Sequence, residues 1–301
     1  MSVVVVGSVA LDSVQTPTGK VDDAIGGSAT YFSIAGSRFS NIDLVGIVGR
    51  DFPKAGLELF KAKNINIDGL EIVDGKTFRW GGRYKLNMNE RDTLFTELNV
   101  FENFQPKLPD SYKNNSILFL GNIHPELQLD VLKQMNNESL IILDTMNLWI
   151  EISREKLLEV INKSDVVIIN EDEVRQLMGN SSVYKSAKEM LKMKPKILII
   201  KKGKNGALIY FKNKMFVVPA YPVEKVVDPT GAGDSFAGGF VGYLDSLNKK
   251  NHTFRDYKMA MIYGTVMASF LVESFSINKL NAVTDDEIET RVKEMIDMIT
   301  I

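Results

Sequence analysis

From residue 116 onward, the chain alternates short apolar runs with amphipathic stretches. The runs are Ile117–Leu120, Leu140–Leu143, Val166–Ile169 and Ile197–Ile200, and a similar run, Val3–Val6, opens the chain. Strands that alternate with helical segments form βαβ units, and successive units build a parallel sheet. Continuous β-branched runs are typical of strands that helices cover on both faces. The alternation therefore predicts an α/β fold around a mostly parallel sheet.

Polar side chains follow these strands where each strand ends. Asp12 comes just past the first strand, Asn122 follows Ile117–Leu120, and the glycine pair Gly26-Gly27 opens a helical stretch. Ligands of open α/β sheets bind beyond the carboxyl ends of the strands, and paired glycines let the backbone approach a ligand. These residues are therefore candidates for binding a small polar substrate. Asp12 and Asn122 also fit a role as turn or cap residues.

The most specific motif is the stretch 227–236, Val-Asp-Pro-Thr-Gly-Ala-Gly-Asp-Ser-Phe. Gly231 and Gly233 allow a tight turn, and a helical pattern begins at Ser235, so free backbone N–H groups meet the positive end of a helix dipole. That arrangement predicts an anion site, most naturally for phosphate. Asp234 lies inside it, where a carboxylate suits the removal of a proton from an attacking hydroxyl. A plain helix N-cap is the alternative, but it does not need this glycine pattern.

Two further strand ends carry polar or charged groups. Asn170 and Glu173 lie three residues apart on one face of a predicted helix, from which they could reach a hydrated Mg²⁺. Lys201, Gly203 and Gly206 place positive charge and a glycine turn at the next strand end. The acids around Asn170 also fit a helix start, where the dipole favours negative charge.

Residues ~70–104 have a different pattern. Thr77–Leu86 and Thr93–Leu98 alternate, carry aromatic residues and flank a polar turn, 87–91, so we expect an antiparallel ribbon apart from the parallel sheet. Such a flap could close over a substrate and exclude water. Trp80 and Tyr84 would either stack on a base or sugar, or form the core of the flap, which the burial of most aromatic residues favours.

The composition excludes several other classes. With 36 Lys and Arg against 38 Asp and Glu, the chain has no basic excess for nucleic acid, and the lack of cysteine excludes disulfides and a cysteine nucleophile. No apolar run is long enough to cross a bilayer and no basic leader precedes the first strand, so we expect a cytoplasmic protein without a membrane partner. The turn after that strand lacks the G-x-G-x-x-G of dinucleotide dehydrogenases.

The stretch Asp228–Phe240 resembles the C-terminal signature of PfkB-type (ribokinase-like) kinases. The resemblance extends over nearly the whole chain, since other family motifs occur in the same order: Asp12, Gly26-Gly27, Gly49-Arg50-Asp51 with Gly56, Asn170-x-x-Glu173, and Lys201 with Gly203. It implies one ribokinase-like domain, 1–301, with a three-layer α/β/α fold, a mostly parallel central sheet and a small antiparallel β lid. The lid would comprise residues of about 11–30 and 70–104.

The resemblance also implies an activity, which is ATP-dependent transfer of the γ-phosphoryl to a hydroxymethyl group with Mg²⁺ as cofactor. Asp234 matches the catalytic base, and the amides of Gly231, Ala232 and Gly233 match the anion hole. The nucleotide and Mg²⁺ contacts implied are Asn170, Glu173, Lys201, Gly203, Gly206 and Thr230, with Glu173 reaching the metal through water. The acceptor contacts implied are Asp12, Gly26, Gly27, Asn122 and Asp234. Asp228 and Thr230 would supply oxygens to a potassium ion.

The acceptor stays open at this stage. We expect a sugar, with a nucleoside as the alternative and a non-catalytic nucleotide or sugar sensor on the same fold as the second alternative. Tyr31 stands where many sugar-kinase relatives carry a substrate-binding asparagine, which weakens a ribokinase-type substrate. A coupled assay of ADP release would separate these hypotheses. Relatives that dimerise through the flap suggest a homodimer.

Overall fold

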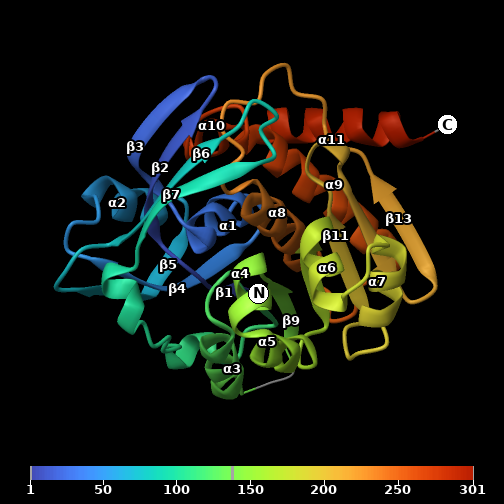
Figure 1. The fold of residues 1–301 in the computed structure, drawn as a ribbon, viewed down its shortest axis with the longest axis horizontal. Helices are drawn as coiled ribbons and strands as arrows, with labels where there is room; N and C mark the ends of the chain where they lie inside the picture. The colour runs from blue at the N-terminus through green and yellow to red at the C-terminus, as the bar shows by residue number, and fades with distance from the viewer. Residues whose placement is uncertain (1, 137–138, 301) are drawn as a thin grey trace.

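The computed structural model describes residues 2–136 and 139–300, and within these ranges the strands form two sheets. The larger sheet has nine strands in the order β13-β12-β11-β10-β9-β8-β1-β4-β5 (Figure 1). Neighbouring strands of this sheet pair in parallel, except that β12 pairs antiparallel with both β11 and β13. Their bounds are β1 Ser2–Val6, β4 Asn41–Gly49, β5 Ile65–Val73, β8 Ile117–Leu120, β9 Leu140–Asp144, β10 Val166–Asn170, β11 Ile197–Lys201, β12 Ala207–Phe211 and β13 Lys214–Val218.

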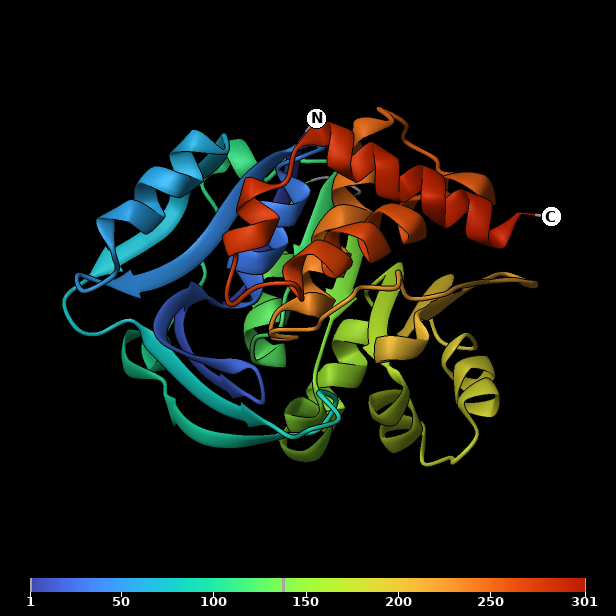
Figure 2. The same cartoon turned by 90° about the horizontal axis from the view of Figure 1, so that it is seen from above.

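Helices cover both faces of this sheet, which confirms the predicted three-layer fold (Figure 2). One layer holds α1 Ser28–Gly36, α2 Lys54–Ala62, α8 Ala232–Ser246, α9 Phe254–Leu271, α10 Asn278–Ala282 and α11 Asp285–Ile299. The other holds α3 Pro125–Gln134, α4 Asn147–Ile152, α5 Arg154–Ile161, α6 Glu171–Met178 and α7 Val183–Met190. In the described ranges, no helix has the length and apolar character needed to cross a membrane.

Each helical layer shares its own hydrophobic core with the sheet. In β1, Val3 and Val5 belong to the core under α1, α8 and α9, whereas Val4 and Val6 belong to the core under α3, α5 and α6. Successive side chains of a strand point to opposite faces, so a continuous valine run supplies both cores. This is why the apolar runs located the strands from the sequence.

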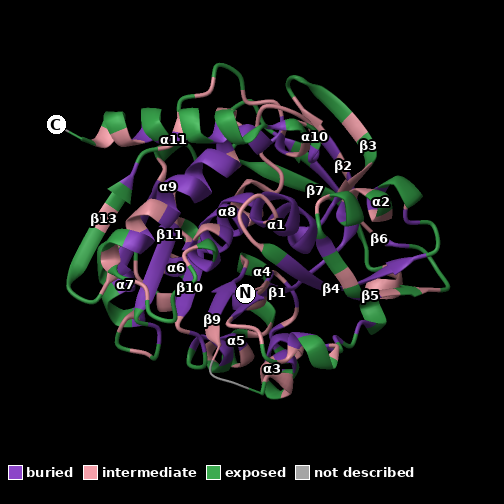
Figure 3. Ribbon diagram, turned by 180° about the vertical axis from the view of Figure 1, so that it is seen from behind, coloured by how far each residue is buried: buried purple, intermediate pink, exposed green. Residues whose placement is uncertain are grey.

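The smaller sheet, which we call the lid, has the order β3-β2-β6-β7. Its strands are β2 Ala10–Thr16, β3 Gly19–Gly26, β6 Phe78–Tyr84 and β7 Arg91–Glu97, and β7 is exposed along its whole length (Figure 3). The outer pairs are antiparallel, but β2 and β6 pair in parallel, which the predicted ribbon did not include. The reason is that β2 and β6 both leave the same edge of the large sheet, after the parallel strands β1 and β5.

The lid is also smaller than the ranges that we expected from the sequence. Residues 28–30 start α1, and residues 70–73 end β5 at the edge of the large sheet. At the root of the lid, Asp51 accepts hydrogen bonds from the backbone N–H and the hydroxyl of Thr77, both at 2.7 Å, and from Arg79 at 3.1 Å. Asp51 of the Gly-Arg-Asp motif therefore anchors β6 to the core.

Candidate active site

The α8 helix begins at a tight turn formed by residues 229–232. The N–H of Ala232 donates to the carbonyl of Pro229 at 3.1 Å, and Gly231 has φ 78° and ψ 2°, as the third residue of a type II turn requires. A Cβ on Gly231 would lie 2.3 Å from Cγ of Tyr31, so the backbone rests directly on this ring. Both the backbone angle and the close contact therefore require glycine at this position.

This turn changes which amides can form the anion hole. The sequence implied Gly231, Ala232 and Gly233, but the amide of Ala232 is engaged by Pro229 to close the turn. Gly233 and Asp234 lie in the first turn of α8, where a helix offers no carbonyl to its N–H groups. Of the three implied amides, the turn therefore uses that of Ala232, and Gly233 keeps its place at the positive end of the helix.

A buried ion pair lies beside this turn. Nζ of Lys201, at the end of β11, lies 3.0 and 3.2 Å from the carboxylate oxygens of Asp144, at the end of β9. The same Nζ lies 2.9 Å from the position that a Cβ on Gly233 would take, so the lysine contacts the start of α8. Burial lowers the pKa of Lys201, but Asp144, Glu173 and Asp234 raise it more, so the pKa is raised and the side chain stays protonated.

Asp234 is half-buried between these charges, in the first turn of α8. Burial is the main cause that raises its pKa; the negative charge of Asp144 raises it further, and Lys201 opposes both. A carboxylate with a raised pKa binds a proton more readily than an ordinary aspartate does. The geometry thus combines a proton acceptor with amide donors and a fixed cation.

Asn170 and Glu173 form a reciprocal capping box at the start of α6. Oδ1 of Asn170 accepts from the N–H of Glu173 at 2.8 Å, and Oε2 of Glu173 accepts from the N–H of Asn170 at 2.9 Å. Burial raises the pKa of Glu173 to about 7, against the attraction of Lys201. The structural role that the sequence allowed for this pair is present, and it fixes the Glu173 carboxylate near Lys201.

Asp12 lies across the site, on β2 of the lid, and is also buried. The hydroxyl of Tyr31 donates to Oδ2 of Asp12 at 3.0 Å, and burial raises the pKa of Asp12 to about 7. The glycine pair makes room for this arrangement: a Cβ on Gly26 would lie 2.0 Å from the Asp12 carboxylate, and one on Gly27 would lie 2.5 Å from the carbonyl of Ser8. Tyr31 thus links the acceptor-side carboxylate to the turn before α8.

Asp228 and Thr230 connect this turn to the rest of the protein. The Asp228 carboxylate is 1% exposed and accepts from the N–H of Thr230 at 2.9 Å and of Ser276 at 3.4 Å. The hydroxyl of Thr230 donates to the hydroxyl oxygen of Tyr84 at 3.3 Å. Tyr84 is buried, so of the two sequence hypotheses for this residue the packing role is confirmed.

Trp80 lies on the inner face of the lid. It is the register partner of Asp12, and paired residues of neighbouring strands point to the same face of a sheet. Its ring lies over Gly82, where a Cβ would approach within 2.2 Å, and the guanidinium of Arg91 lies 5.3 Å from its centroid. Sequence reasoning gave Arg91 no role, because Arg91 pairs with Tyr84 in the strand register and only its side chain approaches Trp80.

Asn122 does not present a free side chain to the acceptor. Its Oδ1 accepts from the indole N–H of Trp149 at 2.7 Å, and its amide donates to the sulfur of Met146 at 3.0 Å. The sequence implied that Asn122 contacts the substrate. In the structure, α4 packs Trp149 against the end of β8, and Asn122 bonds this residue instead. No spacing in the sequence showed this contact.

Three of the six residues assigned to the nucleotide line one cavity of about 390 Å³, whereas Asn170, Glu173 and Thr230 do not belong to its lining. Lys201, Gly203 and Gly206 line it together with Gly233. The remaining wall is largely apolar and includes Tyr221, Val223, Val226, Phe236, Ala268 and Val272. A pocket with an apolar wall and a few polar groups at one end suits a ligand with a flat base and a charged tail.

The chain is similar in sequence to proteins of known family. Residues 2–282 match the model of the pfkB family of carbohydrate kinases. The chain is 30% identical over 254 residues to a cytidine kinase of Thermococcus kodakarensis, which covers 81% of this chain and 88% of that protein. It is 26% identical over 284 residues to a nucleoside kinase of Methanocaldococcus jannaschii, covering 94% and 89% of the two chains.

Solved structures show the same fold. The crystal structure of the Methanocaldococcus jannaschii nucleoside kinase, an archaeal member of the ribokinase family, matches with a TM-score of 0.78 at 25% identity and covers 97% of this chain and 98% of that one. A putative ribokinase II from E. coli in complex with ATP and Mg²⁺ matches with a TM-score of 0.80 at 21% identity, covering 97% and 99%.

Proposed function

Since the chain belongs to the pfkB family of carbohydrate kinases, which transfer a phosphoryl group from ATP to an alcohol, we propose that its acceptor is the hydroxymethyl group of a nucleoside. The observation that carries the proposal is the position of Trp80, whose indole lies on the same inner face of the lid as Asp12. An indole is a stacking surface for a base, while the oxygens of an aspartate side chain form hydrogen bonds with ribose hydroxyls.

The reaction is an in-line transfer in which the acceptor oxygen bonds to the γ-phosphorus and the bond from that phosphorus to the β–γ bridging oxygen breaks. ADP leaves with the electron pair, and Asp234 takes the proton of the acceptor hydroxyl. The amides of Gly231 and Gly233, with the positive end of α8, stabilise charge on the transferring group. Lys201 adds a fixed positive charge on the nucleotide side of that turn.

Mg²⁺ would neutralise charge on the phosphates and orient them. In the described part of the chain, no cluster of three or more His, Cys, Asp or Glu residues could hold a metal alone. This donor set fits an ion that keeps its waters and binds mainly through phosphate oxygens, with the fixed carboxylate of Glu173 contacting a water ligand.

A potassium ion at Asp228 and Thr230 remains a proposal. The two carboxylate oxygens of Asp228 accept the N–H groups of Thr230 and Ser276. These bonds hold the negative charge of Asp228 beside the turn before α8. Equal activity in potassium chloride and in tetramethylammonium chloride would remove the proposal. A marked requirement for potassium supports it.

The experiment that tests the acceptor is a coupled assay of ADP release across a panel of nucleosides and free sugars. We expect turnover with nucleosides and none with 5′-deoxynucleosides, which lack the hydroxymethyl oxygen. Turnover confined to free sugars would establish a sugar kinase, the function that the sequence alone favoured. ATP binding without transfer to any acceptor would instead indicate a sensor.

The lid also offers a surface for a second copy of the chain. Leu94, Phe95 and Leu98 are exposed at the edge strand β7 or just beyond it, and an unpaired edge strand with apolar side chains is prone to association. We propose a homodimer through this edge in the cytoplasm, where ATP is available. Light scattering of the wild type and of Phe95→Asp tests it, because a monomeric wild type contradicts the dimer.

A further inference from the structure

The turn between β6 and β7 extends beyond the acceptor side of the site. Asn87, Met88 and Asn89 of this turn line the nucleotide cavity together with Lys201 and Gly203. Oδ1 of Asn89 lies 3.5 Å from the position that a Cβ on Gly203 would take. In Figure 1 the end of the hairpin lies beside the segment between β13 and α8, which also lines this cavity.

The hairpin tip, defined here as residues 86–89, is held in one conformation. Oδ1 of Asn87 accepts from the N–H groups of Asn89 and Glu90, both at 3.1 Å, and the Asn87 amide donates to Glu90 at 2.9 Å. Met88 has φ 56°, a left-handed conformation that is unfavourable for a residue with a side chain. The local conformation of the tip is therefore fixed, with Met88 and Asn89 at the cavity.

We propose that Met88 and Asn89 form a wall of the nucleotide pocket, so that the lid closes over ATP as well as over the acceptor. The proposal rests on the kinase function above. Met88 is a flexible apolar side chain, which suits contact with the face of a base or the ribose of a nucleotide. Asn89 carries an amide beside the turn at Gly203 and suits a hydrogen bond to a ribose or phosphate oxygen.

One hairpin then touches both substrates. Trp80 of β6 lies on the inner face beside Asp12, and the tip of the same hairpin lines the nucleotide cavity. A substrate that holds the hairpin closed leaves less ordering for the second substrate, so their affinities rise together. The effect is reciprocal, because each substrate must change the affinity of the other by the same factor.

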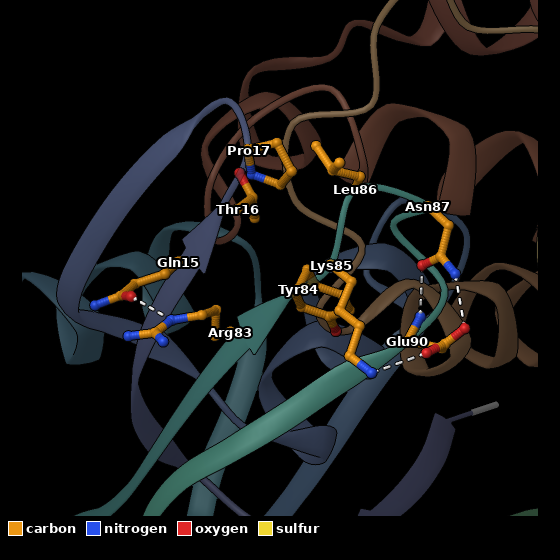
Figure 4. A pocket seen from close by; sticks show the side chains of 9 residues that line it. All are labelled: Gln15, Thr16, Pro17, Arg83, Tyr84, Lys85, Leu86, Asn87 and Glu90. Carbon is orange, nitrogen blue, oxygen red and sulfur yellow. Dashed lines mark hydrogen bonds and ion pairs between the residues drawn. The ribbon is translucent and has the colours of Figure 1, made fainter.

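Leu86, which belongs to the same hairpin tip, provides a control for the variants of Met88 and Asn89. Leu86 is 89% exposed and lines a different hollow, with Thr16, Pro17 and Tyr84 (Figure 4). It does not belong to the lining of the nucleotide cavity among the described residues. Leu86→Ala therefore alters the same turn, by a similar loss of apolar surface, without touching the proposed wall.

The test is the dissociation constant of the non-hydrolysable analogue AMP-PNP with Mg²⁺, measured by calorimetry without acceptor. Met88→Gly suits the positive φ, so the Met88→Gly/Asn89→Ala double variant should fold, which circular dichroism checks. We expect its affinity to fall about tenfold, equivalent to about 1.4 kcal/mol. Leu86→Ala should stay within about twofold of the wild type.

An unchanged dissociation constant in the double variant overturns the proposal, and so does an equal loss in Leu86→Ala. Because binding of AMP-PNP needs no acceptor and no turnover, this result is independent of the acceptor assay. A tenfold loss of affinity with no acceptor phosphorylated would uphold the wall and reject the kinase. Turnover of an acceptor, together with an unchanged affinity of the double variant for AMP-PNP, would support the kinase and reject the wall.

Discussion

The two halves of the site are built in different ways. On the large sheet, Lys201 and Asp144 are paired at the ends of buried strands, and the turn before α8 is packed on Tyr31. On the lid, β7 is exposed, and the Trp80 ring lies against Gly82 and beside the guanidinium of Arg91. The buried half is preorganised for charge, as catalysis requires, whereas the lid half can move to admit substrates. Changes in the first half should therefore reduce stability and turnover, and changes in the second should reduce affinity.

The largest effect is expected at Gly231. Gly231→Ala combines a positive φ with a clash against Tyr31, which together should cost about 2–4 kcal/mol of unfolding free energy and displace the anion turn. Chemical denaturation and an assay of phosphoryl transfer measure both losses. Gly179→Ala is the matched control, because Gly179 also has a positive φ, 62°, but has open space around it. Equal losses of unfolding free energy in the two variants would show that the contact with Tyr31 does not contribute.

Breaking the buried ion pair should have the next largest effect. Lys201→Met leaves the carboxylate of Asp144 buried without its cation, at a cost of about 3 kcal/mol in unfolding free energy. Lys156→Met breaks the exposed pair with Glu159 and should cost less than about 0.5 kcal/mol. Urea denaturation of both variants tests the contrast. Similar losses of unfolding free energy in the two variants would show that the Lys201–Asp144 pair is not preorganised.

Asp12 should make the stability of the ligand-free protein depend on pH. Its pKa is raised from 3.8 to about 7 by burial, so the folded protein holds more protons than the unfolded chain between these values. The stabilisation is therefore complete below about pH 4 and is lost as the pH rises through about 7, at roughly 1.4 kcal/mol per pH unit for one proton.

Urea denaturation of the wild type and of Asp12→Asn between pH 5 and 7 measures this difference. The variant should show a shallower decline, with Asp234 and Glu173, whose pKa values are also raised, accounting for the rest. The same slope in both proteins would show that Asp12 titrates near its ordinary pKa, in contact with water.

The smallest effect is expected for a substitution of Trp80 in the lid. Trp80→Ala should raise KM for a nucleoside about tenfold, equal to about 1.4 kcal/mol, with little change in melting temperature. Arg83→Ala is the control on the same strand, since Arg83 points to the opposite face and bonds Gln15 at 2.9 Å (Figure 4). A change in turnover number with KM unaffected would place Trp80 outside acceptor recognition.

Much of the fold could be predicted because its signals are local. The apolar runs located the strands, and the acids around Asn170 indicated the start of α6, where Asn170 and Glu173 form a capping box with bonds of 2.8 and 2.9 Å. The glycine turn around Asp234 was equally clear, because positive φ and helix starts depend on neighbouring residues.

The remaining features depend on contacts between distant segments. The amide of Ala232 is consumed by the turn, Asn122 is bound by Trp149 of α4, and Trp80 meets Asp12 only through the parallel pairing of β2 with β6. Tyr31 shows the same principle: its sequence position weakened a ribokinase-type substrate, but did not show that its ring packs on Gly231 and its hydroxyl bonds Asp12. Spacing along the chain does not contain this information.

The most direct test of the central claim compares turnover and nucleotide binding in Asp234→Asn. The account predicts that kcat falls by about 10²–10⁴-fold, because the acceptor hydroxyl loses its proton acceptor, while AMP-PNP binds within a few-fold of the wild type. Turnover within a few-fold of the wild-type rate would contradict the account, since the carboxylate at the start of α8 would then have no part in the transfer.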